Sequence, residues 1–125
     1  MLGAHDAVAT VAVRRIADAR RFYEELVGLE VAYEGDGHMV AYAAGAVTLL
    51  VYESRFAGTN RATGVTWPVG DAVDEIVRDL AGRGVRFEHY DLEGTTCDGD
   101  VHVAGPMRTA WFADPDGNIH ALVNA

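Results

Sequence analysis

Hydrophobic and polar positions follow the same pattern in the two halves of the chain. Residues 13–31 (VRRIADARRFYEELVGLEV) and 69–87 (VGDAVDEIVRDLAGRGVRF) align without a gap at an offset of 56 (69 − 13 = 56). In both segments apolar residues recur at helical spacing, and a glycine then precedes an alternating apolar run. Asp71 has the chemistry of an N-cap for the second helix, with Gly82 and Gly84 as its stop signals. The pattern therefore predicts two amphipathic helices in equivalent places.

Short apolar runs with strand character surround each predicted helix. They are ATVAV, EVAYE, MVAYAAG and VTLLVYE in the first half, and GVTWPVG, VRFEHYD, MRTAWF and IHALVN in the second. Each half thus predicts a β-α-β-β-β module. The modules span about 7–54 and about 62–125 of a single domain, 1–125. Residues 92–106 are expected to form a long loop at a rim or lid.

The stretch DPDGN, residues 114–118, raises the question of a metal loop. Asp114, Asp116 and Asn118 match the first three ligand positions of a helix-loop-helix calcium site. The glycine falls at the fourth position instead of the sixth, and the twelfth position is Ala125, which is no ligand. Pro115 and Gly117 have the conformational preferences of a tight turn. The stretch is therefore predicted to connect two strands.

Charge and composition exclude some classes of partner. Nineteen acidic and ten basic residues give a net charge of −9, which disfavours nucleic acid and anionic membrane surfaces. The one basic cluster (Arg14, Arg15, Arg20 and Arg21) is interpreted as a solvated helix face. No export signal or long apolar segment is present, so a cytoplasmic location is expected. Cys97 is the single cysteine and has no internal partner for a disulfide.

The paired modules, the pattern V-x-V-x-x-I-x-x-A-x-x-FYEELVGLEV and the closing WFADPDGNIHALVN resemble the vicinal-oxygen-chelate superfamily. This superfamily comprises glyoxalases, bleomycin-resistance proteins and extradiol dioxygenases, and the resemblance covers essentially the whole chain. The segment YESRFAGTNRATGVTWPV also resembles a bacterial subgroup of it. The implied fold class is α+β: two tandem β-α-β-β-β modules form a curved, eight-stranded mixed sheet, a cup with helices on its outer face.

In metal-using members of the superfamily, a His or Gln on the first strand of each module and a Glu on the last strand of each hold one divalent ion. By the resemblance, these positions fall at Val8 and Gly64, and at about Leu50 and Ala121. None of these four residues has a donor for a divalent ion. The sequence therefore predicts no metal and no cofactor. Among the histidines, His120 is expected to be a satisfied core or interface residue, and His5 to lie in a terminal tail.

Strand alternation then suggests what lines the cup, because residues of the same parity as the former ligand positions point inward. The predicted ligand-binding residues are Thr10, Tyr42, Thr48, Tyr52, Thr66 and Trp111. Tyr33 and Tyr90 are further candidates for the walls. The competing interpretation is that these aromatic residues fill the core. No arrangement of nucleophile and base is visible, so the catalytic residues are unknown.

Two functional hypotheses follow. The first is a metal-free protein of the bleomycin-resistance type that binds a small aromatic or cationic molecule in the cup. The alternative is an enzyme of the same superfamily, a lyase, isomerase or dioxygenase-like protein that uses atypical site residues. The resemblance also implies a homodimer, because unpaired sheet edges need cover.

Overall fold

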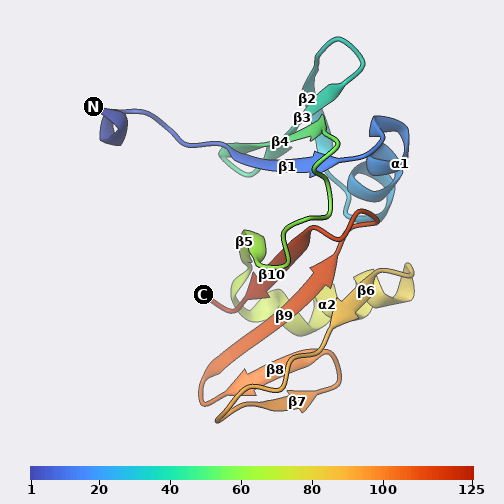
Figure 1. The fold of residues 1–125 in the computed structure, drawn as a ribbon. Helices are drawn as coiled ribbons and strands as arrows, with labels where there is room; N and C mark the ends of the chain where they lie inside the picture. The colour runs from blue at the N-terminus through green and yellow to red at the C-terminus, as the bar shows by residue number, and fades with distance from the viewer. The chain divides into compact units, whose positions relative to one another are not determined.

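The computed structural model describes all 125 residues, which form two compact units, Met1–Gly58 and Thr59–Ala125 (Figure 1). Each unit contains one mixed sheet and one principal helical segment, so the predicted α+β class is confirmed. The boundary falls inside the segment that joins the two predicted modules.

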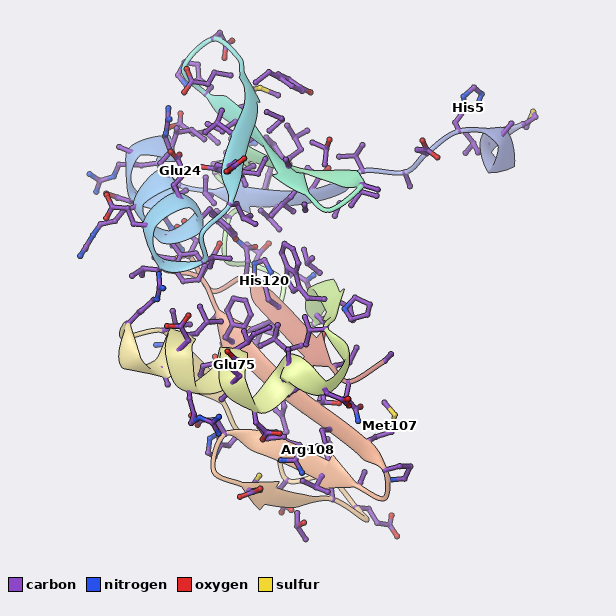
Figure 2. All side chains as sticks on the ribbon, turned by 180° about the vertical axis from the view of Figure 1, so that it is seen from behind. His5, Glu24, Glu75, Met107, Arg108 and His120 are labelled. Atoms are coloured by element: carbon purple, nitrogen blue, oxygen red, sulfur yellow. The ribbon has the colours of Figure 1, made fainter.

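Unit one begins with an extended arm that carries the short helix η1 (Leu2–Ala4), and His5 follows it there (Figures 1 and 2). The remaining elements are β1 (Ala9–Val13), α1 (Ile16–Arg20), η2 (Arg21–Leu26), β2 (Glu30–Glu34), β3 (Met39–Ala44) and β4 (Val47–Glu53). The strand order is β1-β4-β3-β2. β1 runs parallel to β4, and the other pairs are antiparallel. The predicted β-α-β-β-β order of this module is confirmed.

Unit two has the same connectivity with one insertion. Its elements are β5 (Thr63–Pro68), η3 (Gly70–Ala72), α2 (Val73–Gly82), β6 (Arg86–Glu88), β7 (Thr96–Asp98), β8 (Val101–Ala104), β9 (Met107–Ala113) and β10 (Ile119–Val123). The strand order is β5-β10-β9-β8-β7, and β6 also pairs with β9. β5 and β10 are parallel, as β1 and β4 are in unit one.

The insertion corrects one prediction. Residues 92–106 were expected to be a loop, but they contain β7 and β8, which pair as an antiparallel hairpin. The chain therefore has ten strands in two open sheets, where the sequence predicted eight in one. The alternation of Cys97–Asp98 and Val101–Ala104 is too short to give a clear period-2 signal. Pairing with β9 stabilises β8 through ladder hydrogen bonds that no local pattern reveals.

The core of unit one lies between its sheet and its helical segment. The buried strand residues alternate along the chain and share one face: Val11, Val13, Val40, Tyr42, Leu49 and Val51. Ile16, Ala19, Phe22 and Tyr23 provide the buried helical side. Tyr23 stacks on Tyr42, with ring centroids 6.0 Å apart. The helical pattern in the sequence thus identified the helix face that covers the sheet.

The predicted first helix changes its hydrogen-bond pattern half-way along. α1 continues directly into η2, a π-helix in which the Val27 N–H donates to the Phe22 carbonyl at 2.9 Å. Glu24, labelled in Figure 2, lies on η2. Its carboxylate accepts a hydrogen bond from the Tyr42 hydroxyl at 2.8 Å and pairs with Arg20. The Arg20 guanidinium lowers the pKa of Glu24, and burial together with Glu24 raises the pKa of Tyr42. This charged contact fixes the helix against β3.

The second helix starts differently from the prediction and ends as predicted. Its N-cap is Ala72, with no side-chain cap, because Asp71 lies within the preceding helical turn η3. At the other end, the Val85 N–H bonds to the Leu80 carbonyl and the Gly84 N–H bonds to the Ala81 carbonyl, both at 3.0 Å. This is the Schellman arrangement, which requires the positive φ of 88° that Gly84 adopts. The Asp71 prediction was therefore wrong.

The DPDGN stretch is a turn between β9 and β10, as predicted. Asp114 is almost completely buried, and its carboxylate accepts hydrogen bonds from the backbone N–H groups of Asp116 (3.0 Å) and Asn118 (2.8 Å). The Asn118 side-chain amide donates to the second oxygen at 2.7 Å. Asp114 therefore holds the turn by hydrogen bonds to the chain's own amides.

His120 lies in the core of unit two, on the same sheet face as Phe112 (Figure 2). It is 0 % exposed and stacks on Phe112, with ring centroids 4.9 Å apart and an interplanar angle of 7°. The Trp67 indole N–H donates to its Nδ1 at 3.1 Å. The sequence prediction of a satisfied core histidine is confirmed. Burial lowers the pKa of His120 to about 4.

The buried His120 should make the stability of the fold depend on pH. Its pKa is about 4 in the folded chain, against an ordinary value of 6.5 for histidine. Between these values the unfolded chain binds a proton that the folded chain does not, so stability is complete above pH 6.5 and decreases as pH falls towards 4. The expected total loss is about 3 kcal/mol, at roughly 1.4 kcal/mol per pH unit.

Urea unfolding of the protein and of His120→Phe at pH 4.5, 5.5, 6.5 and 7.5 measures this contribution. The variant should have a smaller slope of stability against pH between 4.5 and 6.5. His5→Gln, which changes an exposed histidine, provides the matched control and should retain the full slope. Equal slopes in His120→Phe and the unmodified protein would contradict the expectation.

Candidate ligand-binding site

Each sheet has one face covered by its helical segment and one face that is not, which we call the open face. The strand registers define which residues share it. Thr10, Leu50 and Ala41 form a row across β1, β4 and β3 in unit one. Thr66, Ala121 and Trp111 form the corresponding row across β5, β10 and β9 in unit two. These rows contain three of the predicted binding residues, together with two of the four former metal-ligand positions.

The open face of unit one carries Thr10, Thr48 and Tyr52. Thr48 and Tyr52 lie on β4 with the same parity as Leu50, and Tyr52 is 40 % exposed. The Thr10 hydroxyl is exposed and donates to the Val8 carbonyl at 3.2 Å. These three side chains stand where strand alternation placed them. Tyr33 pairs with Ala41 and shares this face, although it lies on the edge strand β2.

Tyr42 does not lie on the open face. It is 0 % exposed, pairs with Leu49 on the helix-covered face and stacks on Tyr23. The predicted pocket role of Tyr42 is thus replaced by a core role. The physical reason is the alternation within β3, where the bulky Val40 and Tyr42 face the helix and the small Ala41 and Ala43 face away. The alternation of large and small residues along β3 was visible in the sequence. The prediction for Tyr42 did not take it into account.

Unit one also has a pocket of about 420 Å³ lined by Arg14, Glu53, Ser54 and Arg55. Glu53 accepts hydrogen bonds from the Ile16 backbone N–H at 2.9 Å and pairs with His38 Nδ1 at 2.6 Å. The Ile16 N–H, and then His38, lower the pKa of Glu53, while Glu53 raises the pKa of His38. The Glu53 carboxylate therefore joins the start of α1 to the turn before β3.

Trp111 stands at the centre of an aromatic cluster on the open face of unit two. Its ring meets Tyr90 edge-on at 5.0 Å and His102 edge-on at 4.8 Å, between ring centroids. Its indole N–H donates to the Thr63 hydroxyl at 3.2 Å. Because Trp111 alternates with the core residues Ala110 and Phe112, it faces away from α2. We name Trp111, Tyr90, His102 and Thr63 the Trp111 cluster.

His102 is the polar centre of the Trp111 cluster, and it was not predicted. It is 2 % exposed and pairs with Thr109 across β8 and β9. Its Nε2 accepts a hydrogen bond from the Tyr90 backbone N–H at 2.9 Å, whereas its Nδ1 is buried and has no hydrogen-bond partner. A buried polar group without a partner costs about 1–3 kcal/mol, so such atoms commonly mark functional positions.

Two further groups beside the Trp111 cluster were also not predicted. His89 Nε2 lies 2.6 Å from the Asp100 carboxylate, and the His89 ring meets the His102 ring edge-on at 5.9 Å. Cys97 is the register partner of His102 on the edge strand β7, and it is exposed. The hairpin β7–β8 brings these residues together. Their proximity could not be predicted from the sequence, because the hairpin that brings them together was not predicted.

The four positions at which the sequence resemblance implies metal ligands do not fit a metal here. Val8 precedes β1 and Leu50 lies on β4, while Gly64 lies on β5 and Ala121 on β10. Aliphatic side chains and glycine offer no lone pair to a divalent ion. No group of three or more His, Cys, Asp or Glu residues is arranged to hold a metal ion. We therefore assign no step of any reaction to a metal.

The comparisons with known proteins agree with this architecture. The fosfomycin resistance protein FosX of Listeria monocytogenes (monoclinic form) has a TM-score of 0.70 at 15 % identity, with 97 % of this chain and 90 % of that chain covered. A glyoxalase/bleomycin resistance protein/dioxygenase of Alicyclobacillus acidocaldarius has a TM-score of 0.70 at 17 % identity, with 95 % and 89 % covered. The integron cassette protein HFX_CASS4, from the mobile metagenome of Halifax Harbour sewage outfall, has a TM-score of 0.71 at 16 % identity, with 94 % and 96 % covered.

At these identities the solved structures establish a shared fold, which is that of paired β-α-β-β-β modules. The model of the glyoxalase/bleomycin resistance protein/dioxygenase superfamily matches residues 6–122. The chain therefore belongs to this superfamily, as its sequence pattern implied. No curated protein matches the chain. None of its helices is long and apolar enough to cross a membrane.

The lack of metal-binding side chains at Val8, Leu50, Gly64 and Ala121 leads to a prediction about metal content. The purified protein should contain no stoichiometric divalent metal, and chelation should leave its melting temperature unchanged, because a bound metal would contribute its binding free energy to folding. Elemental analysis and thermal unfolding with and without a chelator test this. About one nickel, zinc, iron or manganese per chain would contradict it.

Proposed function

We propose that the protein is a metal-free member of its superfamily that binds a small aromatic or cationic molecule. The observation that carries this proposal is the Trp111 cluster, an aromatic surface on the open face of unit two that contains a buried polar atom without a partner. Small-molecule sites typically combine apolar and aromatic walls with a few polar groups that fix the orientation of the ligand. The Trp111 cluster has both.

The chemistry of the open faces favours binding by stacking and hydrogen bonding. Trp111 and Tyr90 offer ring faces and edges, and an aromatic pair adds about 0.5–1.5 kcal/mol beyond the area that it buries. Thr66 lies in the same row as Trp111, and Thr10, Thr48 and Tyr52 offer hydroxyl groups on unit one. The acidic net charge of −9 favours neutral or cationic molecules over anions.

An enzymatic function of the same superfamily remains the alternative, and one observation favours it. His89 and Asp100 form a 2.6 Å pair in which the carboxylate orients the imidazole, and His89 lies beside the Trp111 cluster. A histidine oriented in this way has the chemistry of a general base. Loss of turnover in His89→Gln, with substrate binding retained, would favour the enzyme.

Replacing the central ring should weaken ligand binding without unfolding the protein. We expect Trp111→Ala to weaken the binding of small aromatic probes by about tenfold, or about 1.4 kcal/mol. Acetophenone and benzylammonium are suitable probes, one neutral and one cationic. Titration monitored by backbone amide NMR shifts measures the affinity, and urea unfolding measures stability in parallel. Met107→Ala, an exposed substitution on the same strand, is the matched control.

The competing core role of Trp111 gives a different result. Truncation of a buried Trp typically costs about 3–5 kcal/mol of stability. A severe loss of stability in Trp111→Ala, with unchanged probe affinity in the folded fraction, would assign Trp111 to the core. The absence of any probe binding to the unmodified protein would also remove the main support for the proposed function.

We also propose a homodimer, on the basis of superfamily membership and of the unpaired edges of β2 and β7. Light scattering should give about twice the chain mass of 13.4 kDa. A mass close to that of one chain across a range of protein concentrations would contradict this. The cytoplasmic location likewise stays a prediction.

A further inference from the structure

We infer that the ligand of the Trp111 cluster is an aromatic molecule that presents an uncharged hydrogen-bond acceptor, such as a carbonyl oxygen, to Nδ1 of His102. This inference rests on the proposed function and narrows it. The proposed function leaves open whether the ligand is aromatic or cationic, and the protonation of His102 bears on that choice.

The hydrogen bond from Tyr90 determines which nitrogen of His102 carries the proton. Nε2 accepts the Tyr90 backbone N–H at 2.9 Å, so it must present its lone pair. A neutral imidazole has one protonated nitrogen, and this must then be Nδ1. Nδ1 is therefore a hydrogen-bond donor, and this donor has no acceptor within the chain. A ligand that brings an acceptor would satisfy it.

The donor is located beside the aromatic surface. His102 meets Trp111 edge-on at 4.8 Å, and Tyr90 lies 5.0 Å from Trp111 and 6.1 Å from His102, between ring centroids. A planar ligand on the Trp111 ring would thus place its substituents next to His102. Two contacts of different kinds, one with a ring face and one with a polar group, fix the orientation of a ligand.

Neighbouring groups cover the buried Nδ1, and the ring of Tyr90, whose centroid lies 6.1 Å from that of His102, belongs to a segment without regular structure. His102 is 2 % exposed, so a ligand must displace part of this cover. Tyr90 lies between β6 and β7, outside any strand or helix, and its side chain is partly exposed. The contact from Tyr90 to Nε2 uses its backbone N–H, so its ring can swing aside while that hydrogen bond remains.

The charges near the cluster favour an uncharged acceptor. Asp100 pairs with His89, and Glu88 lies 3.9 Å from Arg86, while Asp91 and Glu93 are exposed on the segment that follows Tyr90. Asp100 and Glu88 are offset by these partners, but the exposed Asp91 and Glu93 add to the net charge of −9 and oppose a carboxylate ligand. A cationic group offers no acceptor, and it would face the Nδ1 hydrogen. A neutral carbonyl on an aromatic ring supplies an acceptor for the Nδ1 hydrogen and carries no negative charge.

Probes that share one ring and differ in a single group test the inference. Acetophenone and ethylbenzene have almost the same shape, and only acetophenone has an acceptor. Benzoate and benzylammonium add a negative and a positive charge. We expect acetophenone to bind the unmodified protein about tenfold more tightly than ethylbenzene, a difference of about 1.4 kcal/mol, and more tightly than either charged probe. NMR titration of the full chain measures the four affinities.

A variant that keeps a ring but removes the donor completes the test. His102→Phe should bind acetophenone no better than ethylbenzene, so the ratio of the two affinities should fall from about tenfold to about one. This ratio compares two probes on one variant, and a general change of the aromatic surface affects both. His102→Gln, which retains an N–H donor, should recover part of the difference. His5→Phe, a substitution in the N-terminal arm, is the matched control and should behave as the unmodified protein.

The test does not depend on these variants folding. In the unmodified protein, the ¹⁵N resonance of His102 Nδ1 should shift on addition of acetophenone and should not shift with ethylbenzene. Equal affinity for the two probes would overturn the inference and leave the proposed aromatic surface intact. Tighter binding of benzylammonium would overturn it in favour of a cationic ligand. If no probe binds, the proposed function itself fails.

Discussion

The covering of one sheet face by one helical segment is the constraint on which the structure of each unit depends. A short sheet needs an apolar partner on one face, and a single amphipathic helix supplies it. In unit one this produces the buried set that includes Tyr23 and Tyr42; in unit two it produces the stack of His120 on Phe112. The helix cannot cover both faces, so alternate residues of every strand are left on the open face.

This constraint separates core residues from open-face residues along each strand. On β9, Phe112 contributes to the core, while its neighbour Trp111 belongs to the aromatic cluster. On β10, His120 is buried against the helix side, while Ala121 lies in the open-face row of Trp111. Substitution on the open face therefore changes the chemistry of the fold without altering its core. The same modules can accommodate a metal site or an aromatic surface.

The sequence predicted the features that repeat along the chain, and it failed where pairing was non-local. The two helices, the modules and the DPDGN turn follow from periodicity and turn chemistry, which neighbouring residues determine. The β7–β8 hairpin depends on pairing with β9, so short segments such as Thr96–Asp98 showed no clear pattern. His102 was placed in a loop for the same reason, and the Trp111 cluster was found only in part. Tyr42 shows that the inward-facing residues must be determined separately for each strand, because a register shift of one residue moves every side chain to the opposite face of the sheet.

The hairpin also explains why unit two, rather than unit one, carries the stronger candidate site. The two units share one connectivity, but only unit two inserts strands between its second and third module strands. The insertion lies beside β9 and contributes His102 and Cys97, while the segment leading to it contributes His89 and Tyr90. Trp111 alone would be a partly exposed ring on a strand. With the inserted residues around it, the ring lies beside the His89–Asp100 pair and the buried Nδ1 of His102, the groups on which the proposed ligand binding rests.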